Sequence, residues 1–82
     1  MEKNHFEQQR CQKLEEEGWI VIREYEKGRP DAIMLKPRDN GGFDVMVREF
    51  KGLGTKCSNE QVQEITRLRL LGIDAEFEFE KK

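Results

Sequence analysis

The sequence predicts an α/β domain in which helix, strand, strand, strand, helix and strand follow one another. Three observations predict this order. Two segments combine apolar residues at helical spacing with N-capping signals, three are rich in β-branched and aromatic residues, and the last alternates strictly. Because 82 residues suit one domain, residues 1–82 are expected to form a single mixed four-stranded sheet flanked by two helices.

The first helix is expected over residues 4–17, with Asn4 as its N-cap and Glu7 three positions on as the capping-box partner. Gly18 suits the position just after a helix. Residues 19–25 are β-branched and aromatic, which favours a strand.

A β-hairpin is expected to follow a turn at residues 26–29. Its strands are 31–36, stopped by Pro37, and 43–51. The loop between them contains Asn40-Gly41, a pair that supplies the positive φ angles of tight turns.

The second helix is expected to start after Ser58, with Gln61 at the capping-box position, and to run to about Leu71 before Gly72. Residues 73–80 alternate strictly and favour a strand, which can join the sheet parallel to a neighbour because a helix precedes it. The alternation predicts the following inward-facing residues: Ile73, Ala75, Phe77 and Phe79.

The hairpin brings acidic residues together. If its turn is centred near Asn40 or Gly41, cross-strand partners have numbers that sum to about 80–82, so Asp31 lies opposite Glu49 or one residue past it. Lys51 projects from the same side of its strand as Glu49, because strand side chains alternate. Two carboxylates on neighbouring strands can hold one hard cation. The spacing therefore predicts a divalent-metal site beside a lysine.

Structural explanations of the same residues stay open. Asp31 is also a common type of turn residue after proline, and Glu49 with Lys51 is also a common exposed charge pair on a strand. Against this, Val45 and Val47 predict that the strand is buried, and a buried charged pair is costly. Two facing carboxylates without a cation would also repel each other.

Pro-Asp at 30–31, a β-hairpin and Glu-Phe-Lys at 49–51, in this order of elements, resemble the PD-(D/E)XK nuclease superfamily. The similarity runs from Phe6 to about Phe79. It is strongest to small stand-alone VRR-NUC nucleases and to archaeal-type Holliday-junction resolvases, and it implies a restriction-endonuclease-like αβββαβ core.

The resemblance implies roles for individual residues. Asp31 and Glu49 would ligate Mg²⁺ or Mn²⁺ together with the backbone carbonyl of Phe50. Lys51 would act on the attacking water or on the charge developing at the phosphate.

Gln61 matches the helix glutamine of VRR-NUC proteins, and Glu7 matches the first-helix glutamate of these families, so both are candidate catalytic residues. Each has a helix-capping explanation as well. Gln61 is expected to point toward the sheet, and Glu7 to share a helix stripe with Cys11 and Leu14.

The distribution of charge bears on nucleic-acid binding. The chain carries a net charge of −2, whereas DNA-binding domains are usually basic. Residues 28–70, however, carry eight Lys and Arg against six Asp and Glu, of which two are the proposed metal ligands. Arg29, Lys56, Arg67 and Arg69 are candidate phosphate contacts, with solvated surface charge as the alternative.

Several other residues are expected to have structural rather than catalytic roles. Four aromatic residues are expected in the core, with stacking on nucleic-acid bases as the alternative: Trp19, Phe43, Phe77 and Phe79. The core is also expected to contain Met34 and Met46, and the lone His5 is expected at the surface. Only two cysteines, Cys11 and Cys57, are present, which favours reduced thiols in the cytoplasm. No segment is apolar enough to predict a signal peptide or a membrane span.

The expected function is that of a Mg²⁺- or Mn²⁺-dependent endonuclease, bacterial or phage-encoded, in DNA repair, recombination or phage DNA processing. A chain this short favours cleavage selected by DNA structure, such as a Holliday junction, flap or fork. A homodimer is expected because sheet edges need covering and two sites match a symmetric junction. The alternatives are a catalytically silent nucleic-acid-binding or accessory module on this fold, and a small structural or regulatory α/β protein.

Overall fold

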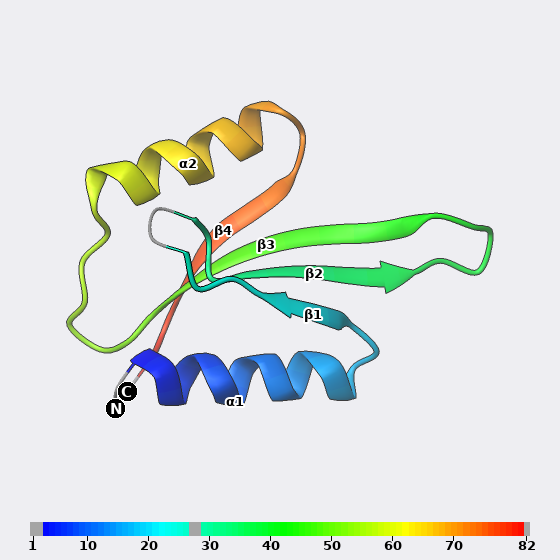
Figure 1. The fold of residues 1–82 in the computed structure, drawn as a ribbon, viewed down its shortest axis with the longest axis horizontal. Helices are drawn as coiled ribbons and strands as arrows, with labels where there is room; N and C mark the ends of the chain where they lie inside the picture. The colour runs from blue at the N-terminus through cyan, green and yellow to red at the C-terminus, as the bar shows by residue number, and fades with distance from the viewer. Residues whose placement is uncertain (1–2, 27–28, 82) are drawn as a thin grey trace.

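The computed structural model describes residues 3–26 and 29–81 (Figure 1). The elements in chain order are α1 (Lys3–Glu16), β1 (Ile20–Arg23), β2 (Ala32–Pro37), β3 (Phe43–Lys51), α2 (Asn59–Leu70) and β4 (Asp74–Phe79). The α/β class and the αβββαβ order are therefore confirmed.

The four strands form one mixed sheet in the order β1-β2-β3-β4. The first two pairings are antiparallel, and β4 lies parallel to β3, reached through the crossover helix α2. The helix α1 runs along one face of the sheet, and α2 lies over the β3–β4 side of the other face (Figure 1). The strands β1 and β4 form the two edges.

The first helix starts earlier than the capping signal predicts. It begins at Lys3, so Asn4 lies inside the first turn and the prediction of Asn4 as N-cap is wrong. The end of the helix agrees with the sequence, because Gly18 adopts a φ of +99° and the N–H of Trp19 donates to the carbonyl of Leu14 at 3.0 Å.

The strand β1 is shorter than residues 19–25. The N–H of Trp19 serves the end of α1, so pairing with β2 begins at Ile20. After Arg23, the N–H of Glu24 still donates to the carbonyl of Asp31 at 2.8 Å, but the N–H groups of Tyr25 and Glu26 both donate to the Glu24 carboxylate at 3.0 Å. That side chain therefore turns the chain away from the sheet. Residues 27 and 28 of the predicted turn lie outside the described residues.

The β2–β3 hairpin has the register that the sequence predicts. Partners run from Ala32 opposite Arg48 to Pro37 opposite Phe43, so their numbers sum to 80. The loop differs in one detail: Gly41 and Gly42, and not Asn40, adopt the positive φ angles. Extending the register by one residue sets Asp31 opposite Glu49.

The helix α2 carries the predicted capping box. The Ser58 hydroxyl accepts a hydrogen bond from the N–H of Gln61, and the Gln61 side chain accepts one from the N–H of Ser58. Gly72, with a φ of +84°, follows the end of the helix.

Each face of the sheet has its own apolar cluster. The α1 side contains Phe6, Cys11, Leu14, Ala32, Met34 and Phe50, with Trp19, Val21 and Met46 packed against them. The α2 side contains Val47, Ile65 and Ala75, with Leu68, Ile73 and Phe77. The smaller second cluster shows that α2 covers only part of its face.

Several predicted core residues are exposed for this reason. Phe43 and Val45 lie at the beginning of β3, where the hairpin extends past both helices, and about half of each is exposed (Figure 1). Phe79, at the end of the edge strand β4, is exposed to a similar extent. The prediction that these three residues are core is therefore wrong, whereas His5 is exposed as expected.

In the part of the chain that the structure describes, no helix is both long and apolar enough to cross a bilayer.

Candidate metal-binding and catalytic site

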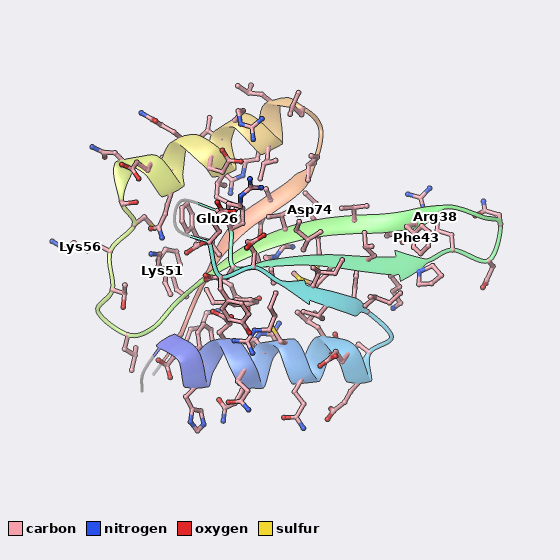
Figure 2. The ribbon with its side chains drawn as sticks, in the orientation of Figure 1. Glu26, Arg38, Phe43, Lys51, Lys56 and Asp74 are labelled. Carbon is pink, nitrogen blue, oxygen red and sulfur yellow. The ribbon has the colours of Figure 1, made fainter. Side chains whose placement is uncertain are left out.

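The structure brings Asp31, Glu49 and Lys51 together on the α2 side of the sheet. Asp31 directly precedes β2, and the other two residues alternate with the fully buried Phe50 at the end of β3. All three polar side chains are buried, with 9%, 2% and 4% of Asp31, Glu49 and Lys51 exposed. Figure 2 shows Lys51 projecting into the space between the two helices.

Asp31 and Glu49 are interlocked through the backbone. The N–H of Asp31 donates to Oε2 of Glu49 at 3.1 Å, and Oδ2 of Asp31 accepts a hydrogen bond from the N–H of Phe50 at 2.7 Å. Each carboxylate therefore binds the strand that carries the other one. These bonds hold both carboxylates at one end of the hairpin.

Gln61 connects the lysine to the glutamate. The ammonium of Lys51 donates to Oε1 of Gln61 at 2.6 Å, and Nε2 of Gln61 donates to Oε1 of Glu49 at 2.9 Å. Lys51 and Glu49 themselves are 4.0 Å apart. Because Gln61 Oε1 also accepts the hydrogen bond from Ser58, the side chain caps α2 and contacts the site at the same time. The two explanations of Gln61 are thus not alternatives.

Glu7 is buried but has a different partner. It belongs to α1, which packs on the Phe50 side of the sheet, opposite the side chains of Glu49 and Lys51. Its Oε2 accepts hydrogen bonds from Nε and Nη2 of Arg23 at 2.9 and 2.5 Å. Because α1 begins at Lys3, Glu7 lies beyond the capping position and the capping explanation is wrong. It shares the buried stripe with Cys11 and Leu14, as the sequence predicts.

Arg23 is a residue that the sequence reasoning missed. Burial lowers the pKa of its guanidinium, but the hydrogen bond that it donates to Glu7 and the nearby charge of Glu7 together outweigh burial, so the net pKa is raised. The guanidinium also lies 5.4 Å from the centre of the Tyr25 ring. Its signal in the sequence was a charged residue at an inward position of a strand, two residues after Val21, where a buried partner is required.

Glu24 is a second residue that was missed. It follows β1 and pairs with Asp31 through the backbone, which extends the row of acids to three neighbouring strands. Its carboxylate is bound by the N–H groups of Tyr25 and Glu26. Glu24 therefore shapes the loop that leads to Asp31.

The four candidate phosphate contacts differ in the partners that their side chains bind. Lys56 lies on the loop before α2 and points to solvent (Figure 2). Arg29 pairs with Glu26 at 3.0 Å, and Arg67 pairs with Glu64 at 2.6 Å. Arg69 donates to the carbonyl of Ala75 at 2.6 Å, which ties it to β4.

The donor chemistry of the site fits a hard cation. Asp31, Glu49 and the Phe50 carbonyl would supply oxygen ligands only, as Mg²⁺ and Mn²⁺ prefer. Among residues 3–26 and 29–81, no three His, Cys, Asp or Glu side chains are close enough to form a metal cage. Two carboxylates suffice for Mg²⁺, because this ion retains waters and binds substrate phosphates.

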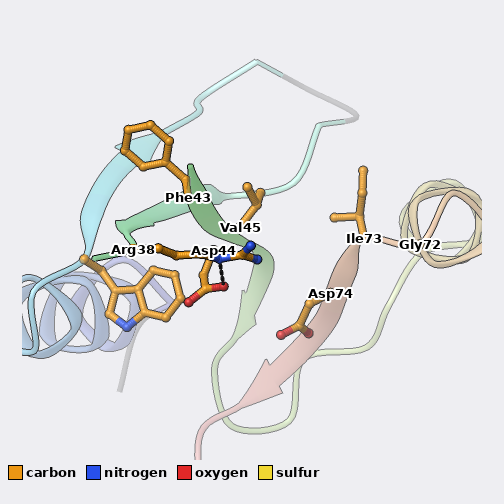
Figure 3. A pocket seen from close by; sticks show the side chains of 8 residues that line it. Arg38, Phe43, Asp44, Val45, Gly72, Ile73 and Asp74 are labelled. Atoms are coloured by element: carbon orange, nitrogen blue, oxygen red, sulfur yellow. Dashed lines mark hydrogen bonds and ion pairs between the residues drawn. The ribbon is translucent and has the colours of Figure 1, made fainter. Parts of the chain in front are cut away.

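A cavity of about 500 Å³ lies away from this site, between the start of β3 and the start of β4 (Figure 3). Its lining includes Phe43, Val45, Ile73 and the ion pair of Arg38 with Asp44. On β3 the cavity is lined by residues 43–45 and the site contains residues 49–51, so their nearest members are roughly 13 Å apart at about 3.3 Å per residue.

Comparisons with known protein families, with curated proteins and with solved structures find no match.

Proposed function

We propose that this protein is a divalent-metal-dependent nuclease of the PD-(D/E)XK type that hydrolyses phosphodiester bonds in DNA. One observation carries the proposal: Asp31, Glu49 and Lys51 are buried together with interlocking hydrogen bonds. Three buried ionisable groups are costly for a chain of 82 residues, and an exposed charge pair would satisfy a purely structural sheet. A site that needs these charges explains their cost.

The residues would divide the chemistry as follows. Asp31 and Glu49, with the Phe50 carbonyl, would hold Mg²⁺ or Mn²⁺, and this ion supplies a Lewis acid and a water of lowered pKa when bound. Lys51 would stabilise the charge that develops on the phosphate or orient the attacking water. Gln61 keeps Lys51 and Glu49 in place through its two hydrogen bonds. Glu7 would act at the site only if it left Arg23.

The proposed substrate is branched DNA, in repair, recombination or phage DNA processing. Residues 28–70 have an excess of two positive charges before any cation binds the two acidic ligands. Lys56 and Arg29 are the exposed candidates for phosphate contact on the loops that flank the site. This modest positive charge suits a protein that reads DNA shape more than sequence. We also propose that the protein is bacterial or phage-encoded and acts in the cytoplasm.

A specific observation also favours the second candidate, a catalytically silent DNA-binding or accessory module. The network of Lys51, Gln61 and Glu49 is internally satisfied, so it can also serve as a structural link between α2 and the sheet. The two functions differ in whether a cation binds and in whether DNA is cut.

Metal binding and cleavage test the proposal directly. Mn²⁺ should raise the melting temperature of the wild type, since ligands that bind the folded state stabilise it, and Asp31→Asn should remove this increase. Junction, flap, fork and linear DNA should then be incubated with Mg²⁺ or Mn²⁺, with Glu49→Gln as the inactive control. If no DNA is cut although Mn²⁺ stabilises the protein, the nuclease proposal fails and the accessory function is favoured.

A further inference from the structure

Part of the α2 side of the sheet is apolar and is covered by no helix among residues 3–26 and 29–81. In the register of the strands, Ile20 lies beside Leu35 and Val45, and Ile22 lies beside Ile33. These side chains alternate with Val21, Met34 and Met46, which face α1, so they all point to the opposite side. The open face is defined by Ile20, Ile22, Ile33, Phe43 and Val45, which are each 38–51% exposed.

The position of α2 explains why this face is open. Ile65 of α2 packs on Val47 and Ala75, so the helix lies over β3 and β4. In the part of the chain that the structure describes, no helix lies above β1 and β2 on this side (Figure 1). Helices and packed sheets both stand about 10 Å above a sheet, so a second sheet would fit in the same layer as α2.

The open face has the size of an interface core. Five adjacent apolar residues that are each about half-exposed form a patch on the order of a few hundred Å². Patches of about this size on a monomer are often functional. A standard interface buries about 800 Å² per partner, of which somewhat more than half is apolar.

The edge of the open face favours self-association. Where the open face meets α2, the lining includes two acids, Glu24 and Glu64, and two arginines, Arg29 and Arg67. Their charges sum to zero, so two identical rims do not repel each other. The adjacent edge strand β1 has neither proline nor lysine, the residues that usually protect an exposed edge from another chain.

We propose that the open face binds the same face of a second copy of this chain, with the two-fold axis running roughly along the strands. In this arrangement β1 of one copy lies beside α2 of the other, so the apolar side chains and the free edge of β1 are covered together. The interaction is isologous and closes as a dimer. The use of two sites on a symmetric DNA junction rests on the proposed function, whereas the interface itself does not.

Sedimentation velocity over a range of protein concentrations, without metal or DNA, tests the interface. The wild type should sediment as a dimer of twice 9.7 kDa. Ile22→Lys should raise the dimer dissociation constant at least about 100-fold, because it places a charge in the apolar core of the interface. Ile22→Thr, which retains a β-branched residue, should raise it by about tenfold and covers the case in which the lysine variant does not fold.

Two controls separate the possible results. Gln9→Lys alters an exposed residue of α1, on the opposite side of the sheet from the open face, so it should leave the dissociation constant unchanged. Glu49→Gln should dimerise like the wild type even though it would lose activity, so loss of cleavage and loss of the dimer are distinguishable. A wild type that remains monomeric at the highest concentration overturns the proposal. So does a dimer that folded Ile22 variants do not weaken.

Discussion

Gln61 offers a quantitative test of the structure, because one side chain caps α2 and joins Lys51 to Glu49. Gln61→Met keeps the length of the side chain and removes all three hydrogen bonds. Hydrogen bonds to charged groups contribute about 1.5–3 kcal/mol each, and water can replace part of this because Gln61 is only half-buried. Loss of the two site bonds should therefore cost about 3 kcal/mol, and loss of the cap about 1 kcal/mol more.

Two variants calibrate this loss of about 4 kcal/mol. Ser58→Ala removes the other hydrogen bond of the capping box, from the N–H of Gln61 to the Ser58 hydroxyl, leaves the two site bonds intact and should cost about 1 kcal/mol. Gln63→Met makes the same substitution at an exposed position of α2 and should change stability by less than about 0.5 kcal/mol. Urea denaturation followed by circular dichroism measures all three, against a total stability of about 4–12 kcal/mol for a domain of this length.

The comparison with Ser58→Ala decides the result. If Gln61→Met and Ser58→Ala cost the same, the bonds from Gln61 to Lys51 and Glu49 contribute no net stability and the reasoning is refuted. A double-mutant cycle gives a second test. With Lys51→Met already present, Gln61→Met should cost at least about 1 kcal/mol less than in the wild type, because the charged donor is gone.

Three further predictions concern other parts of the molecule. Burial raises the pKa of the Cys11 thiol to about 11, so iodoacetamide at pH 8 should alkylate Cys57 much faster than Cys11. The alkylation rate of Cys11 should rise about tenfold per pH unit as its thiolate forms. Equal rates for the two cysteines, measured by mass spectrometry, would contradict the burial of Cys11. Arg23→Met leaves the carboxylate of Glu7 buried without its partner and should lower the free energy of unfolding, measured by urea denaturation, by about 3–5 kcal/mol. Adding Glu7→Met to this variant should restore most of the loss. If the second substitution restores nothing, the two residues are not coupled. Gly72→Ala should lower the free energy of unfolding by about 1 kcal/mol because of the positive φ at this position. No steric contact adds to this cost, since no atom lies within 4 Å of the added methyl group. An unchanged stability would mean that the end of α2 differs from the structure.

The local features of the fold were predictable because short-range signals determine them. The capping box of Ser58 and Gln61 and the glycines that end both helices act within one turn of the chain. The register of the hairpin follows from its short loop, so the opposition of Asp31 and Glu49 could be counted from the sequence. The same alternation predicted that Lys51 and Glu49 share a side.

The errors lie where exposure depends on distant parts of the chain. Phe43 and Val45 have the pattern of core residues, but their side of the sheet is open because α2 crosses only β3 and β4. Phe79 is exposed at the end of an edge strand for a related reason. An alternating pattern indicates which side chains share a face, but it does not indicate whether another element covers that face.

Glu7 shows the same limit at the level of a single contact. Helical spacing predicted that it points inward, and the structure agrees. Its partner, Arg23, comes from a different element, and their meeting depends on how α1 crosses the sheet.

The sequence alone determines the order of the elements and the register of the hairpin. It also determines that Asp31, Glu49 and Lys51 lie at one end of the hairpin. Each of these features depends on neighbours along the chain or across one turn. Only the tertiary structure decided that these charges are buried, that Gln61 joins two of them, and that Ile20, Ile22 and Ile33 remain open to solvent. Burial is set by the packing of helices against strands far away in the sequence, and no local pattern encodes the place where a helix stops covering a sheet.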